Sequence, residues 1–306
     1  MPQTLCRVAA RCGIAVILAA GLSTVARRAE VGVALSAQQL PSEPQRQFGT
    51  GITGAFEGWF DSPAGARLFL IGYLNRNLAQ EIDVPIGPNN RIEPGGPDMG
   101  QPTHFLPGRQ WGVFVIPVPK EFTTADQRFT WTIVANGQTT TIPLRLHPDY
   151  TVTPFADVAV KNTPPFVRLD EHGAALQGPV ARIETAPTRT ISASSPLSLP
   201  VWVTDDARYA SGTMAIPRKL PPPVHLTWSK YRGPGKVSFD AANPPVQTMS
   251  GGGVNVEFRG TATATARFGE PGDYVLHLLV NDFSGEGGAG EVCCWSNALV
   301  KVTVTP

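Results

Sequence analysis

Short runs of alternating apolar and polar residues, separated by glycine, proline, asparagine and aspartate, extend over most of this sequence. Alternation with a period of two is typical of β-strands with one buried face, because successive side chains point to opposite faces of a sheet. The 31 glycines and 30 prolines favour many tight turns over long helices. The pattern therefore predicts an all-β protein.

The predicted strands fall into two groups. The first group lies at 54–60, 67–75, 80–85, 110–117, 128–135 and 139–146. The second lies at 166–169, 180–184, 197–204, 225–231, 236–240, 260–268, 273–282 and 297–304. Asn136-Gly137, between the last two strands of the first group, is typical of a two-residue hairpin turn. Two groups of short strands with regular turns are typical of two sandwiches.

The chain of 306 residues is long enough for two domains with separate cores. We predict two tandem immunoglobulin-like β-sandwich domains after an N-terminal signal segment. The predicted boundaries are a signal peptide at 1–36, a polar linker at 37–50, a first sandwich at 51–150, a hinge at 151–164 and a second sandwich at 165–306.

The N-terminus predicts export. Arg7 and Arg11 precede an apolar run at 13–26, which is the charged start and hydrophobic stretch of a secretory signal and is short for a membrane span. Small residues allow cleavage after residue 21 or after residue 36, and an uncleaved anchor is the alternative. We expect the protein in the periplasm, at the cell surface or outside the cell, without a membrane span after cleavage.

The charge of the chain bears on its partners. Charged residues make up 16% of the sequence and the formal net charge is +1. Such a balance creates no strong field that would attract nucleic acid, so nucleic acid is not expected as a partner. The sequence leaves the partner open between a surface, a glycan and a protein.

One segment, 86–109, departs from the rhythm of strands. It is a loop of more than twenty residues rich in glycine and proline, and loops of that length in compact domains are uncommon and often functional. Its hydrogen-bonding side chains are candidate ligand contacts: Asn89, Asn90, Arg91, Glu93, Asp98 and His104. An ordered crossover that closes the sandwich is the alternative.

The second group of strands contains aromatic and turn residues in a characteristic order: Trp228, Gly233-Pro234-Gly235, Phe239, Phe268, Gly272 and Tyr274. In these residues it resembles PKD-type immunoglobulin-like domains. It implies an immunoglobulin-like fold and a role in adhesion, carbohydrate contact or spacing in an exported protein. An insertion at 214–223 and a glycine-rich stretch at 285–290 depart from the pattern. The first half resembles exported bacterial proteins of unassigned function, which implies no mechanism.

Two of these matched residues have a simple structural interpretation. Tyr274 follows a Pro-Gly turn, where its ring packs inward and its hydroxyl bonds to backbone, as in tyrosine corners. Trp228 lies on one face of its strand with Leu226 and is interpreted as a core anchor.

Cys293 and Cys294 are adjacent and are the two cysteines that remain after signal cleavage. On a strand, one thiol would face the core and the other would face outward, and we expect this unbridged arrangement. A vicinal disulfide, which requires a turn and an oxidising compartment, is the alternative.

The sequence contains few candidate catalytic or metal-binding residues. The five histidines are scattered and no nucleophile-elbow motif occurs. Asp205, Asp206 and Asp282 are candidate calcium ligands if their loops meet, because hard cations bind several oxygen atoms. Calcium is possible on this basis, but no cofactor is expected.

Two functions remain open. The first is a non-enzymatic exported protein of the cell envelope that binds, adheres or acts as a spacer. The second is a secreted carbohydrate-active or hydrolytic enzyme with a loop-built site, for which Glu93, Asp98 and His104 are the acid and base candidates. The first is favoured because no second loop with converging acidic residues is evident.

Overall fold

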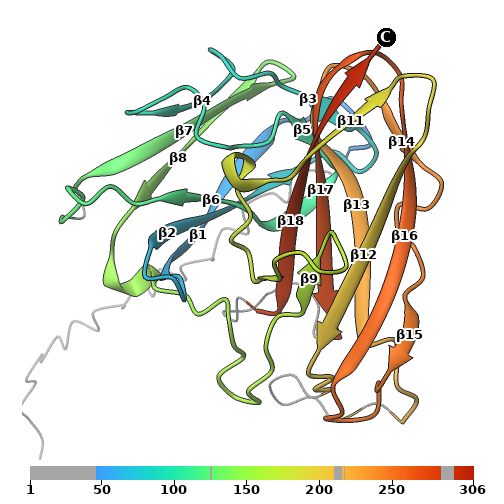
Figure 1. Cartoon of the computed structure of the whole chain (residues 1–306). Coiled ribbons are helices and arrows are strands. Elements are labelled where there is room, and N and C mark those ends of the chain that lie inside the picture. Colours follow the sequence, from blue (N-terminus) through green and yellow to red (C-terminus); the bar gives the residue numbers. More distant parts are fainter. Residues whose placement is uncertain (1–45, 125, 210–215, 217, 284–292) are drawn as a thin grey trace, which may run out of the picture. The chain divides into compact units, whose positions relative to one another are not determined.

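β-strands make up all the long regular elements of the computed structural model, which describes residues 46–124, 126–209, 216, 218–283 and 293–306. Within these ranges the helical elements are two single 3-10 turns, Pro148–Tyr150 and Ile183–Thr185, and no helix is long and apolar enough to cross a membrane. The prediction of an all-β protein is confirmed (Figure 1). The predicted signal segment and most of the predicted linker lie outside the described residues.

The first half of the described chain contains three small antiparallel sheets. One sheet contains β1 (Ile52–Asp61), β2 (Arg67–Asn75) and β6 (Gly108–Pro117). Another contains β4 (Asn90–Glu93), β7 (Arg128–Ala135) and β8 (Gln138–Arg145), and a third pairs β3 (Ile82–Asp83) with β5 (His104–Phe105). These sheets share one apolar core, in which the ring of Trp131 on β7 meets Phe114 on β6 edge to face, with 5.2 Å between ring centroids.

Two larger sheets face each other in the second half. One contains β10 (Leu176–Gln177), β9 (Phe166–Arg168), β12 (Leu197–Asp205), β16 (Phe258–Phe268) and β14 (Val237–Phe239), with β15 (Gln247–Ser250) also paired to β16. The other contains β11 (Thr188–Ser192), β18 (Trp295–Thr305), β17 (Gly272–Asp282) and β13 (Val224–Arg232). Alternating apolar residues of both sheets form the core between them.

The two halves are packed against each other within one compact unit, Pro44–Pro306. The face of the β1-β2-β6 sheet turned away from the first core packs against Trp295, the first residue of β18. The side-chain amide of Asn297 donates a hydrogen bond of 2.7 Å to the carbonyl oxygen of Gly112 on β6. Because β2 is covered on both faces, its sequence is a nearly continuous apolar run rather than an alternation.

Most predicted strands of both groups coincide with observed ones to within two or three residues. The predicted hairpin at Asn136-Gly137 is confirmed, because both residues have positive φ and Ala135 pairs with Gln138. The predicted strand at 180–184 is wrong: this segment leads into the 3-10 turn at Ile183–Thr185. The strands β4, β5, β10, β11 and β15, of two to five residues each, were not predicted, because so short a segment carries little alternation.

The segment expected as a hinge, 151–164, is bonded to both halves. The backbone N–H of Val152 donates to the carbonyl oxygen of Trp59 at 2.9 Å, and the ring of Phe155 meets Phe60 with 5.8 Å between centroids. At its other end the side-chain amide of Asn162 donates to the carboxylate of Asp282. The segment is therefore held at both ends by specific contacts.

Cys293 and Cys294 are joined by a disulfide, which contradicts the expectation of two unbridged thiols. That expectation assumed a strand through both residues, but β18 begins at Trp295, after the pair. The opposite orientation of neighbouring strand side chains therefore does not apply to them. The glycine-rich stretch at 285–290, interpreted as a departure from the PKD pattern, lies outside the described residues.

The structural interpretation of Tyr274 and Trp228 is confirmed. Each side chain is 2% exposed. The Tyr274 hydroxyl donates to the carbonyl oxygen of Glu270 at 2.8 Å and accepts from the backbone N–H of Gly235 at 3.2 Å. The tyrosine therefore fixes the turn that connects β13 to β14.

Candidate functional site

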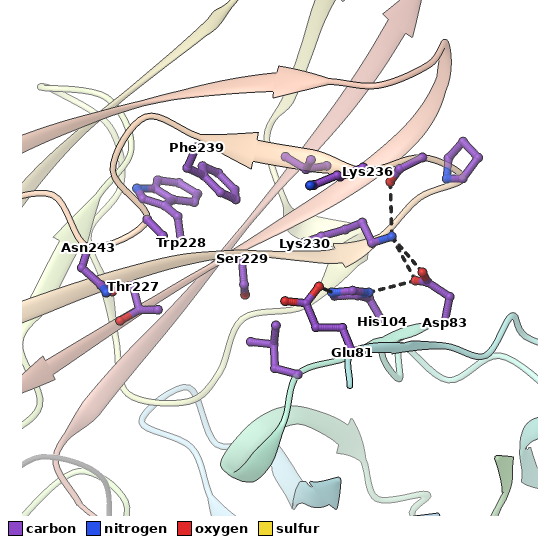
Figure 2. Close-up of a pocket in the computed structure, with 15 residues that line it drawn as sticks. Glu81, Asp83, His104, Thr227, Trp228, Ser229, Lys230, Lys236, Phe239 and Asn243 are labelled. Atoms are coloured by element: carbon purple, nitrogen blue, oxygen red, sulfur yellow. Dashed lines mark hydrogen bonds and ion pairs between the residues drawn. The ribbon is translucent and has the colours of Figure 1, made fainter. Parts of the chain in front are cut away.

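A cavity of about 550 Å³ lies where β3 and β5 of the first half meet β13 and β14 of the second. Figure 2 shows its lining, with a row of charged side chains along one wall and two aromatic rings side by side further along β13 and β14. A volume of this size is typical of pockets that bind small ligands. The side chains that line this cavity are therefore candidates for ligand contact.

His104 on β5 is at the centre of the charged row. Its side chain is 7% exposed, and its Nδ1 lies 2.9 Å from an oxygen of Asp83 while its Nε2 lies 3.3 Å from an oxygen of Glu81. Both carboxylates are acceptors, so both contacts are hydrogen bonds only when the imidazole has a proton on each nitrogen. The ring is therefore held between two acids, each of which is more than half exposed on its other side.

Lys230 on β13 connects this row to the second half. Its Nζ lies 3.0 Å from Asp83 and donates a hydrogen bond of 3.2 Å to the carbonyl oxygen of Gly235. Partial burial acts to raise the pKa of Asp83, but the hydrogen bonds from His104 and Lys230 outweigh it and hold the pKa below its usual value. The carboxylate of Asp83 therefore binds two basic side chains, His104 from the first half and Lys230 from the second.

The opposite part of the cavity is aromatic and polar. The rings of Trp228 and Phe239 lie nearly parallel, with 6.5 Å between centroids and 22° between planes, and Phe239 is the one that is partly exposed. The hydrogen-bonding side chains nearby are Thr227, Ser229, Lys236 and Asn243. Among the described residues, Lys236 has no ion-pair partner and is exposed.

The segment between β4 and β5 holds the two halves together beside this cavity. Arg232 on β13 donates two hydrogen bonds, of 2.9 and 2.8 Å, to the carboxylate of Asp98. The hydroxyl of Tyr231 donates to the carbonyl oxygen of Gly100, and the backbone N–H of Thr103 donates to the carbonyl oxygen of Tyr231 at 3.1 Å. A bidentate pair and two backbone bonds give this contact a fixed geometry.

Five of the six sequence-predicted ligand contacts do not line the large cavity. Asn90 is fully buried: its side-chain amide donates to the carbonyl oxygens of Val84 and Pro102, and its side-chain oxygen accepts from the indole of Trp131. Arg91 forms an ion pair of 2.9 Å with Glu93. Asn89 contributes its backbone carbonyl to Val134. The side-chain amide of Asn90 is therefore occupied inside the core, whereas Asn89, Arg91 and Glu93 are at least partly exposed and stay predictions as ligand contacts.

The acid and base candidates Glu93, Asp98 and His104 are not brought together. His104 lines the large cavity, whereas Asp98 is bonded to Arg232 and lines a separate cavity of about 180 Å³. Glu93 lines neither of these two cavities and is paired with Arg91. A long loop places its residues at different points of a surface, and the sequence has no signal for which of them converge.

The structure adds Glu81, Asp83 and Lys230 to the site. Glu81 and Asp83 lie two residues apart in the predicted strand at 80–85. Residues at this spacing in a strand point to the same face, so the two carboxylates are expected on one face. Lys230 and Asp83 are 147 residues apart, and only the packing of the halves brings them together. The one signal in the sequence was a lysine inside the predicted strand at 225–231, and only the structure showed that this side chain is 8% exposed.

Of the three candidate calcium ligands, Asp205 and Asp282 lie close enough for their charges to interact. Asp205 and Asp282 are both buried, and burial together with the nearby charge of Asp282 raises the pKa of Asp205 to about 8. Asp206 lines the same cavity of about 270 Å³ as Asp205, and it accepts from the backbone N–H and the hydroxyl of Thr163. Across the described ranges, no three histidine, cysteine, aspartate or glutamate side chains are arranged to hold a metal ion.

Comparisons with known proteins give little guidance on this site. No family model matches the chain, and no curated protein matches its sequence. Among solved structures, the chain is similar to a crystal structure of a protein of unknown function from Porphyromonas gingivalis W83. The two are 7% identical over 83% of this chain and 100% of that chain, with a TM-score of 0.22. A similarity this weak does not bear on function.

Proposed function

We propose that this chain is an exported, non-enzymatic binding protein of the cell envelope whose ligand occupies the cavity between β3, β5, β13 and β14. The observation that carries the proposal is that cavity of about 550 Å³, built from both halves and held by specific contacts. In this proposal the halves are two tandem immunoglobulin-like sandwiches and the second is of the PKD type. The facing sheets of the second half and the corner formed by Tyr274 support that part of it.

The lining of the cavity favours a neutral, polyhydroxylated ligand, which we take to be a short glycan. Its carboxylates, Glu81 and Asp83, are balanced by the amines of Lys230 and Lys236, so neither a strongly anionic nor a strongly cationic ligand is favoured. The polar side chains supply donors and acceptors, and the exposed part of Phe239 offers an apolar face to a sugar ring.

Binding is favoured over catalysis by the state of the acidic candidates. The carboxylates of Glu93 and Asp98 are each engaged by an arginine, Arg91 and Arg232. Neither lies with His104 in one cavity, so an acid and a base on opposite sides of a scissile bond would have to come from other residues.

A ligand panel tests the binding site. We expect at least one of cellotriose, chitotriose, maltotriose and xylotriose to raise the melting temperature of the wild-type protein, because a ligand bound by the folded state stabilises it. Lys236→Ala removes a charged donor of the cavity and should weaken that binding about tenfold, measured by calorimetric titration.

Lys120→Ala, at an exposed lysine outside the cavity, is the matched control and should bind as the wild type does. Trialanine and citrate complete the panel. An effect that depends on Lys236 but occurs with trialanine or citrate alone would contradict the glycan assignment. The absence of any effect that depends on Lys236 would contradict the binding site itself.

Export is tested separately. The arginine-flanked apolar run at 13–26 predicts that the mature protein begins between residues 22 and 38. N-terminal sequencing of protein recovered from the cell envelope or medium measures this directly. Recovery of the chain from the cytoplasmic fraction with Met1 intact would show the export proposal to be wrong.

A further inference from the structure

A buried acidic group lies at one end of the second half, away from the cavity of the proposed function. Asp205 is the last residue of β12 and Asp282 is the last residue of β17, and these strands belong to the two facing sheets. The two residues are 4% and 2% exposed. Aspartate is almost never buried to this extent without a partner that offsets its charge.

The hydrogen bonds of Asp205 are incomplete. One carboxylate oxygen, Oδ2, accepts from the backbone N–H of Ala207 at 2.8 Å. The other, Oδ1, is buried and accepts no hydrogen bond from any described residue. A buried carboxylate oxygen without a donor costs free energy, so the arrangement points to a bound group at that position.

The described arginines at this end of the sheet, Arg208 and Arg259, do not supply the missing charge, and Arg259 is paired with Glu257 at 2.8 Å. Arg208 lies 3.5 Å from Asp206, and its guanidinium also donates to the carbonyl oxygen of Val160. No described basic residue forms an ion pair with Asp205. The charge of Asp282 lies close enough to act on Asp205, and like charges in a buried place repel strongly.

Asp205 has a route to solvent, and the carboxylate of Asp282 is oriented by a neighbouring side chain. A cavity of about 270 Å³ is lined by Asp205 together with Thr163, Asp206, Asn255 and Glu257. Asn162, which is fully buried, donates from its side-chain amide to Asp282 and so fixes the direction of that carboxylate. An ion entering through the cavity would therefore meet Asp205 in the lining first, and Asp282, behind the lining, is already oriented by Asn162.

We propose that Asp205 and Asp282 are the two charged ligands of a bound calcium ion, with Asn162 as the positioning residue for Asp282. Calcium binds six to eight oxygen atoms and takes many of them from amides, backbone carbonyls and water, so two carboxylates are sufficient charge for such a site. A soft metal does not fit, because the neighbouring Cys293 and Cys294 are joined in a disulfide and offer no thiolate.

Thermal melting of the exported chain, first freed of metal with a chelator, tests the proposal. Millimolar calcium should raise the melting temperature of the wild type by several degrees, and calorimetric titration should give one ion per chain. Asp205→Asn keeps the shape of the side chain but removes its charge, and both signals should be lost.

Asp273→Asn is the matched control, because Asp273 lies at the opposite end of β17 from Asp282 and accepts a hydrogen bond from the hydroxyl of Thr303; its calcium response should remain. The proposal is overturned if calcium neither stabilises the wild type nor gives heat of binding, or if Asp205→Asn responds as the wild type does. Should Asp205→Asn not fold, Asn162→Ala replaces it and is expected to weaken calcium binding at least tenfold.

Discussion

Replacing Gly233 by alanine should lower the free energy of unfolding by about 2–5 kcal/mol. Gly233 has φ +138°, a backbone conformation that residues with a side chain rarely adopt. A Cβ at this position would also lie far inside the contact distance of the Tyr274 ring, at Cδ1. Tyr274 is 2% exposed and bonded to the same turn, so neither the ring nor the backbone has space to move away.

Gly233→Ala should also weaken ligand binding in the large cavity. The turn that begins at Gly233 supplies Pro234, Gly235 and Lys236 to the lining of the large cavity, and the carbonyl oxygen of Gly235 accepts from Lys230. Chemical denaturation of wild type and Gly233→Ala measures the stability, and the ligand panel measures the site.

Gly65→Ala is the control for backbone strain alone. Gly65 also has positive φ, at +81°, but a Cβ there would have no neighbour within 4 Å. We expect it to cost about 1–2 kcal/mol. If Gly233→Ala lowers the free energy of unfolding no more than Gly65→Ala does, the close contact between Tyr274 and the turn does not contribute to the loss of stability.

Lowering the pH from about 6.5 to 4 should remove on the order of 3 kcal/mol of stability through His277 alone. Burial lowers the pKa of His277 to about 4, and the hydrogen bond of 3.0 Å between Nε2 and the side-chain oxygen of Asn297 offsets that effect only in part. Between these pH values the unfolded chain binds the proton and the folded chain does not. The contribution is therefore complete above the unfolded pKa and is lost as the pH falls towards the folded value.

The measurement is the free energy of unfolding against pH for wild type and His277→Gln. Their difference isolates His277 from other groups, of which Asp205, whose pKa is raised to about 8, acts with the opposite sign over much of the same range. The difference should grow from pH 4 to 6.5 and then stay level. A difference that is constant over the whole range would mean that His277 has the same pKa in the folded and unfolded states, so that its burial does not lower the pKa.

Local pattern was sufficient to predict much of the fold. The alternation in β12 and β16, the hairpin at Asn136-Gly137 and the inward ring of Tyr274 all follow from neighbours in sequence. The disulfide of Cys293 and Cys294 was missed because that inference depended on where β18 begins. A boundary of this kind is set by packing, and short-range pattern does not determine it.

The sequence by itself determined the all-β class, most strand positions and three of the residues that the proposals use: His104, Asp205 and Asp282. Only the tertiary structure decided their partners. Lys230 meets Asp83 across 147 residues, and Asn162 meets Asp282 across 120. The physical reason is that alternation and turn chemistry act between residues near each other in the chain. Contacts between separate sheets depend instead on how whole apolar faces pack.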